Sequence, residues 1–202
     1  ANMVTDQIID DIWQLYDPQW TRRKLRNRSY HEAREPLVPA MLLELLSHQN
    51  FADMRYGLDP NFRFDVSRAI YKGMLKYLHK TSGTPYIVEP LPVKDFSIKG
   101  QDGNYTLSWT PTDDPLEPTA KAKYYIVYER IDNGAFVELA ITDDTYLSVT
   151  PSDNSIYSYK IVAANDGGLS FPSEILALCD IPGGKDQVTI VNGFTRVSGP
   201  AE

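Results

Sequence analysis

The sequence predicts an α+β chain with several domains. Residues 1–83 are expected to form a partial α/β segment, residues 84–182 a seven-stranded β-sandwich, and residues 183–202 a linker or the start of a further module. Three observations lead to this prediction. Apolar residues recur at helical spacing on both sides of one continuous apolar run in the first part. Short alternating strands follow from Pro90 onward, and a Ser-Gly-Thr-Pro cluster at residues 82–85 separates the two patterns.

The composition limits the classes of function. Of the 202 residues, 42% are hydrophobic and 23% are charged, which is ordinary for a globular protein. The formal net charge is -7, and no basic patch stands out that could neutralise phosphates. The one basic cluster, at residues 22–28, is short and is followed by acids, so we interpret it as a solvated surface loop. We therefore expect neither nucleic acid nor an anionic membrane surface as a partner.

The cysteine content and the length of the apolar runs exclude further classes of structure and site. Cys179 is the single cysteine, so this sequence allows no internal disulfide and no cysteine-based metal site. It follows an apolar stretch at residues 175–178, and we expect a buried, unreactive thiol. No apolar run is long enough to cross a membrane, so no membrane span is expected. The first residues lack a basic and then apolar leader, so no secretory signal is expected within this sequence.

The first segment is expected to contain two amphipathic helices and one short helix. The first amphipathic helix covers residues 4–16 and ends at the Asp-Pro pair of residues 17–18, because proline lacks the amide donor. The polar, arginine-rich residues 19–36 are predicted to form a long loop. Residues 51–56 are typical of a short helix, and residues 66–78 of the second amphipathic helix.

An almost unbroken apolar run occupies the middle of this segment, at residues 37–50. Its length and its Pro36 boundary favour a strand that is buried on both faces, as in a parallel sheet. Glu44 lies inside the run, and an ionised carboxylate there is costly unless something pairs with it. The carboxyl end of a parallel strand is also where open α/β sheets place catalytic groups. The alternative is a helix with Glu44 on its solvent side.

The second part shows the pattern of a β-sandwich. Short runs of alternating aromatic and β-branched residues are separated by turn residues at regular spacing. An Asp-Asn-Gly turn at residues 132–134 is typical of a hairpin that needs positive φ. The seven expected strands cover residues 96–98, 105–109, 124–128, 136–140, 146–149, 158–163 and 175–178.

These residues resemble the fibronectin type III family over about residues 88–181. Trp109 stands where that fold keeps its core tryptophan on the second strand, and residues 157–170 are similar to the sixth strand and the loop after it. By the resemblance Tyr157 is the corner tyrosine, whose hydroxyl ties back to upstream backbone. The aromatic residues of this part are interpreted as core rather than as a ligand platform.

The first segment resembles the carboxyl-terminal part of the zinc-dependent N-acetylmuramoyl-L-alanine amidases, over about residues 8–78. That family has a Pro-Ala-x-Leu-x-Glu strand, a Ser-Asn-x-x-Asp loop, a Leu-Asp-Pro-x-Phe-Arg turn and a helix with Gly-Ile-x-x-Tyr. The corresponding pieces here lie in the same order, at residues 38–46, 47–53, 58–63 and 69–77. Two departures are the Leu-Leu pair at residues 45–46, in place of Gly-Phe, and the inserted His48.

By this resemblance Glu44 is the catalytic glutamate, which handles protons for a zinc-bound water. The zinc ligands of the family, two histidines and a glutamate, come from the earlier half of the domain. We therefore expect zinc in an intact parent domain and no metal ligand or cofactor in this chain alone. His31 and His79 are interpreted as ordinary histidines. His48 lies near Glu44 in the sequence, and with Asn50 it is the candidate binding residue.

The combination is similar to large Bacteroides-type cell-envelope proteins, some of which carry the name xanthan lyase. It implies a periplasmic or cell-surface location and a cell-wall glycan or peptide as substrate. Because a buried strand needs neighbours on both edges, we expect a complementary amino-terminal fragment, or self-association through residues 1–83. Two functions remain open. One is a peptidoglycan amidase whose fragment is inactive alone, and the other is a non-catalytic spacer or carbohydrate-associated module of a surface protein.

Overall fold

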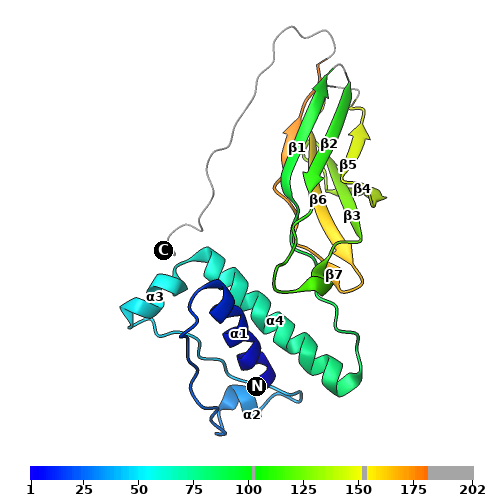
Figure 1. Cartoon of the computed structure of the whole chain (residues 1–202). Coiled ribbons are helices and arrows are strands. Elements are labelled where there is room, and N and C mark those ends of the chain that lie inside the picture. The colour runs from blue at the N-terminus through cyan, green and yellow to red at the C-terminus, as the bar shows by residue number, and fades with distance from the viewer. Residues whose placement is uncertain (102, 152–153, 182–202) are drawn as a thin grey trace. The chain divides into compact units, whose positions relative to one another are not determined.

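The computed structural model describes residues 1–101, 103–151 and 154–181. The chain divides into two compact units, the first covering residues 1–85 and the second beginning at Tyr86 (Figure 1). Each unit has its own hydrophobic core. The linker or further module expected over residues 183–202 lies outside the described residues.

The first unit is helical. Its described helices are α1 (Asn2–Leu15), α2 (His31–Arg34), α3 (Phe51–Gly57) and α4 (Pro60–Ser82). The expected first helix and the short helix are confirmed, whereas α4 begins six residues before the expected start at position 66. The reason is an N-terminal cap: the Asp59 carboxylate accepts a hydrogen bond from Asn61 N at 2.9 Å, and Pro60 occupies the first turn. Gly83 ends α4 with φ +70°, which favours glycine.

The core of this unit lies between α1 and α4. The two helices run antiparallel, since Gly73 late in α4 meets Val4 early in α1, while Phe62 early in α4 meets Tyr16 just after α1. A Cβ on Gly73 would lie 2.6 Å from Val4 Cα, so glycine permits this close approach. The buried apolar side chains come from one stripe of each helix: Val4, Ile8, Ile12, Phe62, Val66 and Ala69.

The prediction of a buried strand at residues 37–50 is wrong. In the structure residues 37–46 form neither helix nor strand, with a bend at residues 37–38, and the described residues 1–85 contain no strand. Met41, Leu43 and Leu45 pack against the α1–α4 core, whereas Leu42 and Glu44 are exposed. The run therefore has cover on one face only, and the described part of the chain supplies no neighbouring strands at its edges. The alternative of a helix in this run is also wrong.

The second unit is a β-sandwich of two antiparallel sheets (Figure 1). One sheet has the order β1-β2-β5. In the other, β3 lies between β4 and β6, and both β7 and β8 pair with β6. The described strands are β1 (Lys94–Gln101), β2 (Asn104–Thr110), β3 (Tyr124–Ile131), β4 (Val137–Thr142), β5 (Tyr146–Val149), β6 (Tyr157–Asn165), β7 (Gly168–Leu169) and β8 (Leu176–Leu178). The seven expected strands correspond to β1 to β6 and β8, and the two-residue β7 was not expected.

Inward-facing side chains of the two sheets form the sandwich core. Trp109 on β2 packs edge-on against Tyr125 on β3, with ring centroids 5.5 Å apart. The expected hairpin turn joins β3 to β4, and Asp132 adopts φ +50° there. The buried core residues are Val93, Phe96, Leu107, Trp109, Tyr125, Val127, Val149, Tyr157, Tyr159, Ile161 and Ala163.

One expectation about the sandwich is wrong. Cys179, predicted to be buried, is exposed. It follows the end of β8, beyond the residues that pair with β6, so no neighbouring strand covers it.

Candidate functional site

Glu44, the predicted catalytic residue, lies on the coil segment between α2 and α3. Its side chain is exposed, and it makes no hydrogen bond or ion pair with the described residues. Within the described ranges, no group of three or more His, Cys, Asp or Glu side chains could hold a metal ion. The buried setting expected for Glu44 is therefore wrong, and its catalytic role stays a prediction.

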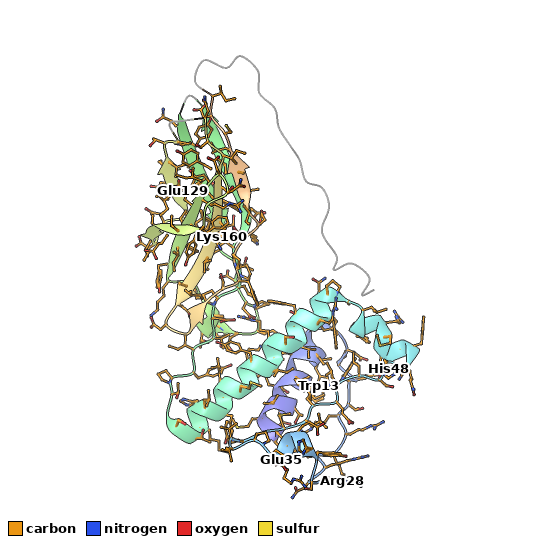
Figure 2. All side chains as sticks on the ribbon, turned by 180° about the vertical axis from the view of Figure 1, so that it is seen from behind. Trp13, Arg28, Glu35, His48, Glu129 and Lys160 are labelled. Carbon is orange, nitrogen blue, oxygen red and sulfur yellow. The ribbon has the colours of Figure 1, made fainter. Side chains whose placement is uncertain are left out.

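The two predicted binding residues lie at the turn that leads into α3, and Figure 2 shows His48 there. His48 is exposed. The Asn50 side chain caps α3 by accepting a hydrogen bond from Ala52 N at 3.0 Å, and Asp53 accepts one from Ser47 N at 2.9 Å. Asn50 thus has a clear structural role at the helix start. Among the described residues, no hydrogen bond joins Glu44 to either residue.

The other two histidines have local partners. His79 Nδ1 lies 2.8 Å from the carbonyl oxygen of Thr84, just past the end of α4. His31 Nδ1 lies 3.9 Å from a Glu35 carboxylate oxygen at an exposed position. These positions fit the interpretation of both as ordinary histidines.

A cleft of about 350 Å³ lies on the side of α1 that faces away from α4. Asp6, Ile9, Asp10 and Trp13 recur at the spacing of one helix face, opposite the stripe that packs on α4. The opposite wall is the loop after α1. The loop residues lining the cleft are Trp20, Thr21 and Arg22.

Three hydrogen-bonded contacts hold this loop along the helix. The Trp13 indole Nε1 donates to the carbonyl oxygen of Trp20 at 2.6 Å. Arg22 lies 3.0 Å from a carboxylate oxygen of Asp6 and donates to Thr5 Oγ1 at 2.5 Å. The ring of Trp20 also packs edge-on against Tyr56, at 5.0 Å between centroids, which ties the loop to the helical core. The cleft is therefore built by the fold rather than by a loose surface loop.

A buried polar network lies on another face of α1. Lys72 Nζ is 2.7 Å from Asp11 Oδ2, with only 2% and 7% of the two side chains exposed. Gln7 Nε2 donates to the other Asp11 oxygen at 2.9 Å. An ion pair so well shielded from water fixes how α1 and α4 align, because a shift would leave a buried charge unpaired.

The ordinary signal of a catalytic centre is a titratable group with a perturbed pKa in a cleft. In this unit the clear shift is that of Tyr16, whose pKa is raised by burial and by its hydrogen bond of 2.5 Å to Asp65 Oδ2. That phenol belongs to the packing between α1 and α4 and does not line the α1 cleft. The chemistry that the cleft offers is recognition by an indole, carboxylates and a guanidinium.

The sequence contains a signal for this cleft that the prediction missed. The apolar stripe of α1 marks the core face, and the opposite stripe carries two aspartates and a tryptophan four and three residues apart. A tryptophan on the polar face of a helix is the informative feature. The return of the loop over that face could not be read from the sequence, since residues 19–36 show no periodic pattern.

No family model matches this chain, and no curated protein matches it. Solved structures with similarity include the twitchin kinase region from C. elegans, with 26% identity and a TM-score of 0.42 over 50% of this chain and 18% of that chain. Another is a fourth FNIII domain of human origin, with 19% identity and a TM-score of 0.44 over 54% of this chain and 92% of that one. A third, FN3tt, has 26% identity and a TM-score of 0.34 over 45% and 94%.

This chain thus spans about a fifth of the twitchin structure. The assignment of the second unit rests on its own strand order. Its two antiparallel sheets, β1-β2-β5 and β4-β3-β6 with the last strand returning to β6, have the arrangement of a fibronectin type III domain. The second unit is a fibronectin type III-like β-sandwich, a fold that serves many functions and supplies no catalytic group by itself.

Proposed function

We propose that this chain is a non-catalytic part of a larger cell-envelope protein at the periplasm or cell surface. Its fibronectin type III-like sandwich spaces other modules, and its helical unit carries the end of an amidase-like domain. The setting of Glu44 is the observation that supports the proposal. A carboxylate that moves protons for a metal-bound water must face that metal in a site shielded from bulk water. Glu44 is instead exposed, on an open segment without described metal ligands around it.

A second candidate function, a zinc amidase in the assembled protein, is favoured by the segment that contains Glu44. Burial alternates from Met41 to Leu45, as it does along a strand that is covered on one face. Within the described residues, positions 36–46 make no backbone–backbone hydrogen bond. A segment with unpaired N–H and C=O groups is able to join a sheet supplied by another polypeptide. Pairing would order the segment and bring Glu44 to the edge of that sheet.

In this assembled form, zinc would be held by the part of the domain outside this chain. Glu44 would act as the proton-transfer group, and a peptidoglycan amide would be the substrate. The name xanthan lyase carried by similar envelope proteins suggests a polysaccharide as an alternative substrate class. No residue of this chain is assigned to lyase chemistry.

The two candidates are separated by one assay on two samples. The 202-residue chain, with added Zn²⁺, should release no free amino group from muramyl dipeptide or from purified peptidoglycan. The longer protein that contains this chain should be tested in parallel, with its zinc content measured. If that protein binds zinc and cleaves the amide, Glu44→Gln should abolish turnover without loss of the metal, whereas the matched control Glu32→Gln should leave turnover unchanged.

Turnover by the isolated chain would overturn the non-catalytic proposal. Full turnover in the Glu44→Gln variant of a zinc-binding longer protein would overturn the role of Glu44 as the proton-transfer group. A longer protein without zinc and without amide cleavage would leave the spacer function as the remaining candidate.

A further inference from the structure

We infer that the cleft on α1 binds a glycan, with a sugar ring seated against Trp13 and hydrogen-bonded to Asp10. This cleft lies on the helix face opposite the one that packs on α4, and Glu44 does not line it. Its volume of about 350 Å³ falls in the range of small-ligand sites, roughly 300 to 1,000 Å³.

Two side chains in the walls of the cleft are available to contact a ligand. Trp13 keeps 47% of its surface exposed although its indole N–H is already engaged by the backbone of the loop. This contact fixes the ring and leaves its apolar surface for a ligand. The Asp10 carboxylate has no hydrogen-bond or ion-pair partner among the described residues. Asp6 is already paired with Arg22, so the two groups partly neutralise each other.

The mixture of groups selects the ligand class. A carboxylate only accepts hydrogen bonds, a guanidinium only donates them, and the Thr21 hydroxyl does both. A ligand that suits all three must itself donate and accept, while presenting an apolar face to the indole. The hydroxyl groups and the C–H face of a pyranose ring meet these requirements together.

Competing ligand classes fit less well. A cation could lie against Trp13 and Asp10, but it would offer no acceptor to the Arg22 guanidinium or the Thr21 hydroxyl in the same cleft. An anion would face the two carboxylates of Asp6 and Asp10. An apolar ligand would leave Asp10 without a partner at the edge of the contact.

The assignment rests on the proposed function in its choice of glycan. A cell-envelope protein meets β-linked amino-sugar chains, so N-acetylglucosamine oligomers are the first probe and cellotetraose the second. The geometry of the cleft itself does not depend on whether the longer protein cleaves amides.

The test is a titration of the full chain with chitotetraose, followed by the indole N–H signals in NMR spectra. We expect the signals of Trp13 and Trp20 to shift, with a Kd of about 1 mM or below, while Trp109 in the sandwich core stays unchanged. Trp13→Ala should abolish the shift of Trp20. Asp10→Asn should weaken binding about tenfold or more, because it removes a charge-assisted hydrogen bond. Asp143→Asn, the same change outside the cleft, should have no effect.

Several results would overturn the inference. These are no shift of Trp13 with either oligosaccharide, binding that Asp10→Asn and Trp13→Ala leave unchanged, or a shift with trilysine in place of the sugars. Should Trp13→Ala lose the dispersed spectrum of a folded protein, Trp13→Phe and Asp10→Asn decide the question instead. Failure here leaves the amide-release and zinc measurements unaffected, so the two proposals can fail separately.

Discussion

At the scale of single residues, the buried ion pair of Lys72 and Asp11 is the most consequential feature of the helical unit. Replacing Lys72 by Met leaves Asp11 buried without its cation, next to a Gln7 whose side-chain oxygen is already without a described partner. We expect the free energy of unfolding of this unit to fall by about 3–5 kcal/mol. Urea titration of circular dichroism at 222 nm measures it.

Two further variants control this prediction. The double variant Lys72→Met with Asp11→Leu should recover much of the loss, since no charge is then left buried. Arg34→Ala, which breaks the exposed pair with Glu35, should change the free energy by at most about 1 kcal/mol. A loss no greater in Lys72→Met than in Arg34→Ala would show that the buried pair does not hold the helices together.

Tyr16 provides a pH dependence at the same scale. Its pKa is raised above the ordinary value of 10.0, first by burial and then by the hydrogen bond to Asp65. A raised pKa favours the protonated phenol in the folded state, so this stability is fully present below the unfolded pKa and is lost as the pH rises above it. We expect thermal scans at increasing pH above about 10 to show the helical unit weakening. The pH-dependent part should be smaller in Tyr16→Phe, and an equal loss in both proteins would contradict the account.

At the scale of elements, the contact between α1 and α4 depends on Gly73. Alanine would favour the helix by about 1 kcal/mol in isolation, but its Cβ would lie 2.6 Å from Val4 Cα and 3.2 Å from the Met3 carbonyl oxygen. We expect Gly73→Ala to destabilise the helical unit by about 1–3 kcal/mol, since backbone must shift to make room. Ser67→Ala on the exposed side of α4 is the control. A stabilised Gly73→Ala variant would show that the helices separate without cost.

The elements also show what the sequence predicts and what it does not. The sandwich strands carry their own alternating pattern, and Trp109 and Tyr157 lie in its core as their types suggest. The helix ends follow local rules at Asp59, Pro60 and Gly83. The prediction for the run at residues 37–46 was wrong because a continuous apolar sequence indicates only that its side chains need apolar contacts. It does not indicate whether neighbouring strands are present to pair with its backbone. The α1 cleft was missed because it depends on how a non-periodic loop folds back.

At the scale of the whole molecule, the two units have separate cores, which makes their stabilities separable. Leu107 is fully buried in the sandwich core. We expect Leu107→Ala to lower the stability of the sandwich by about 2–5 kcal/mol, read from the Trp109 indole signal during urea titration. The transition of the helical unit, read from the Trp13 indole signal, should keep its midpoint. A matched fall of both midpoints would contradict independent cores.

The central claim is that the segment around Glu44 is an unpaired coil, which joins a sheet as a strand only when another polypeptide supplies one. Hydrogen exchange of the backbone amides of residues 41–46 tests this most directly. In the isolated chain we expect these amides to exchange with little protection, far faster than those at the centre of α4. In the longer protein they should become strongly protected. Protection in the isolated chain equal to that of α4, or no gain of protection in the longer protein, would contradict the account.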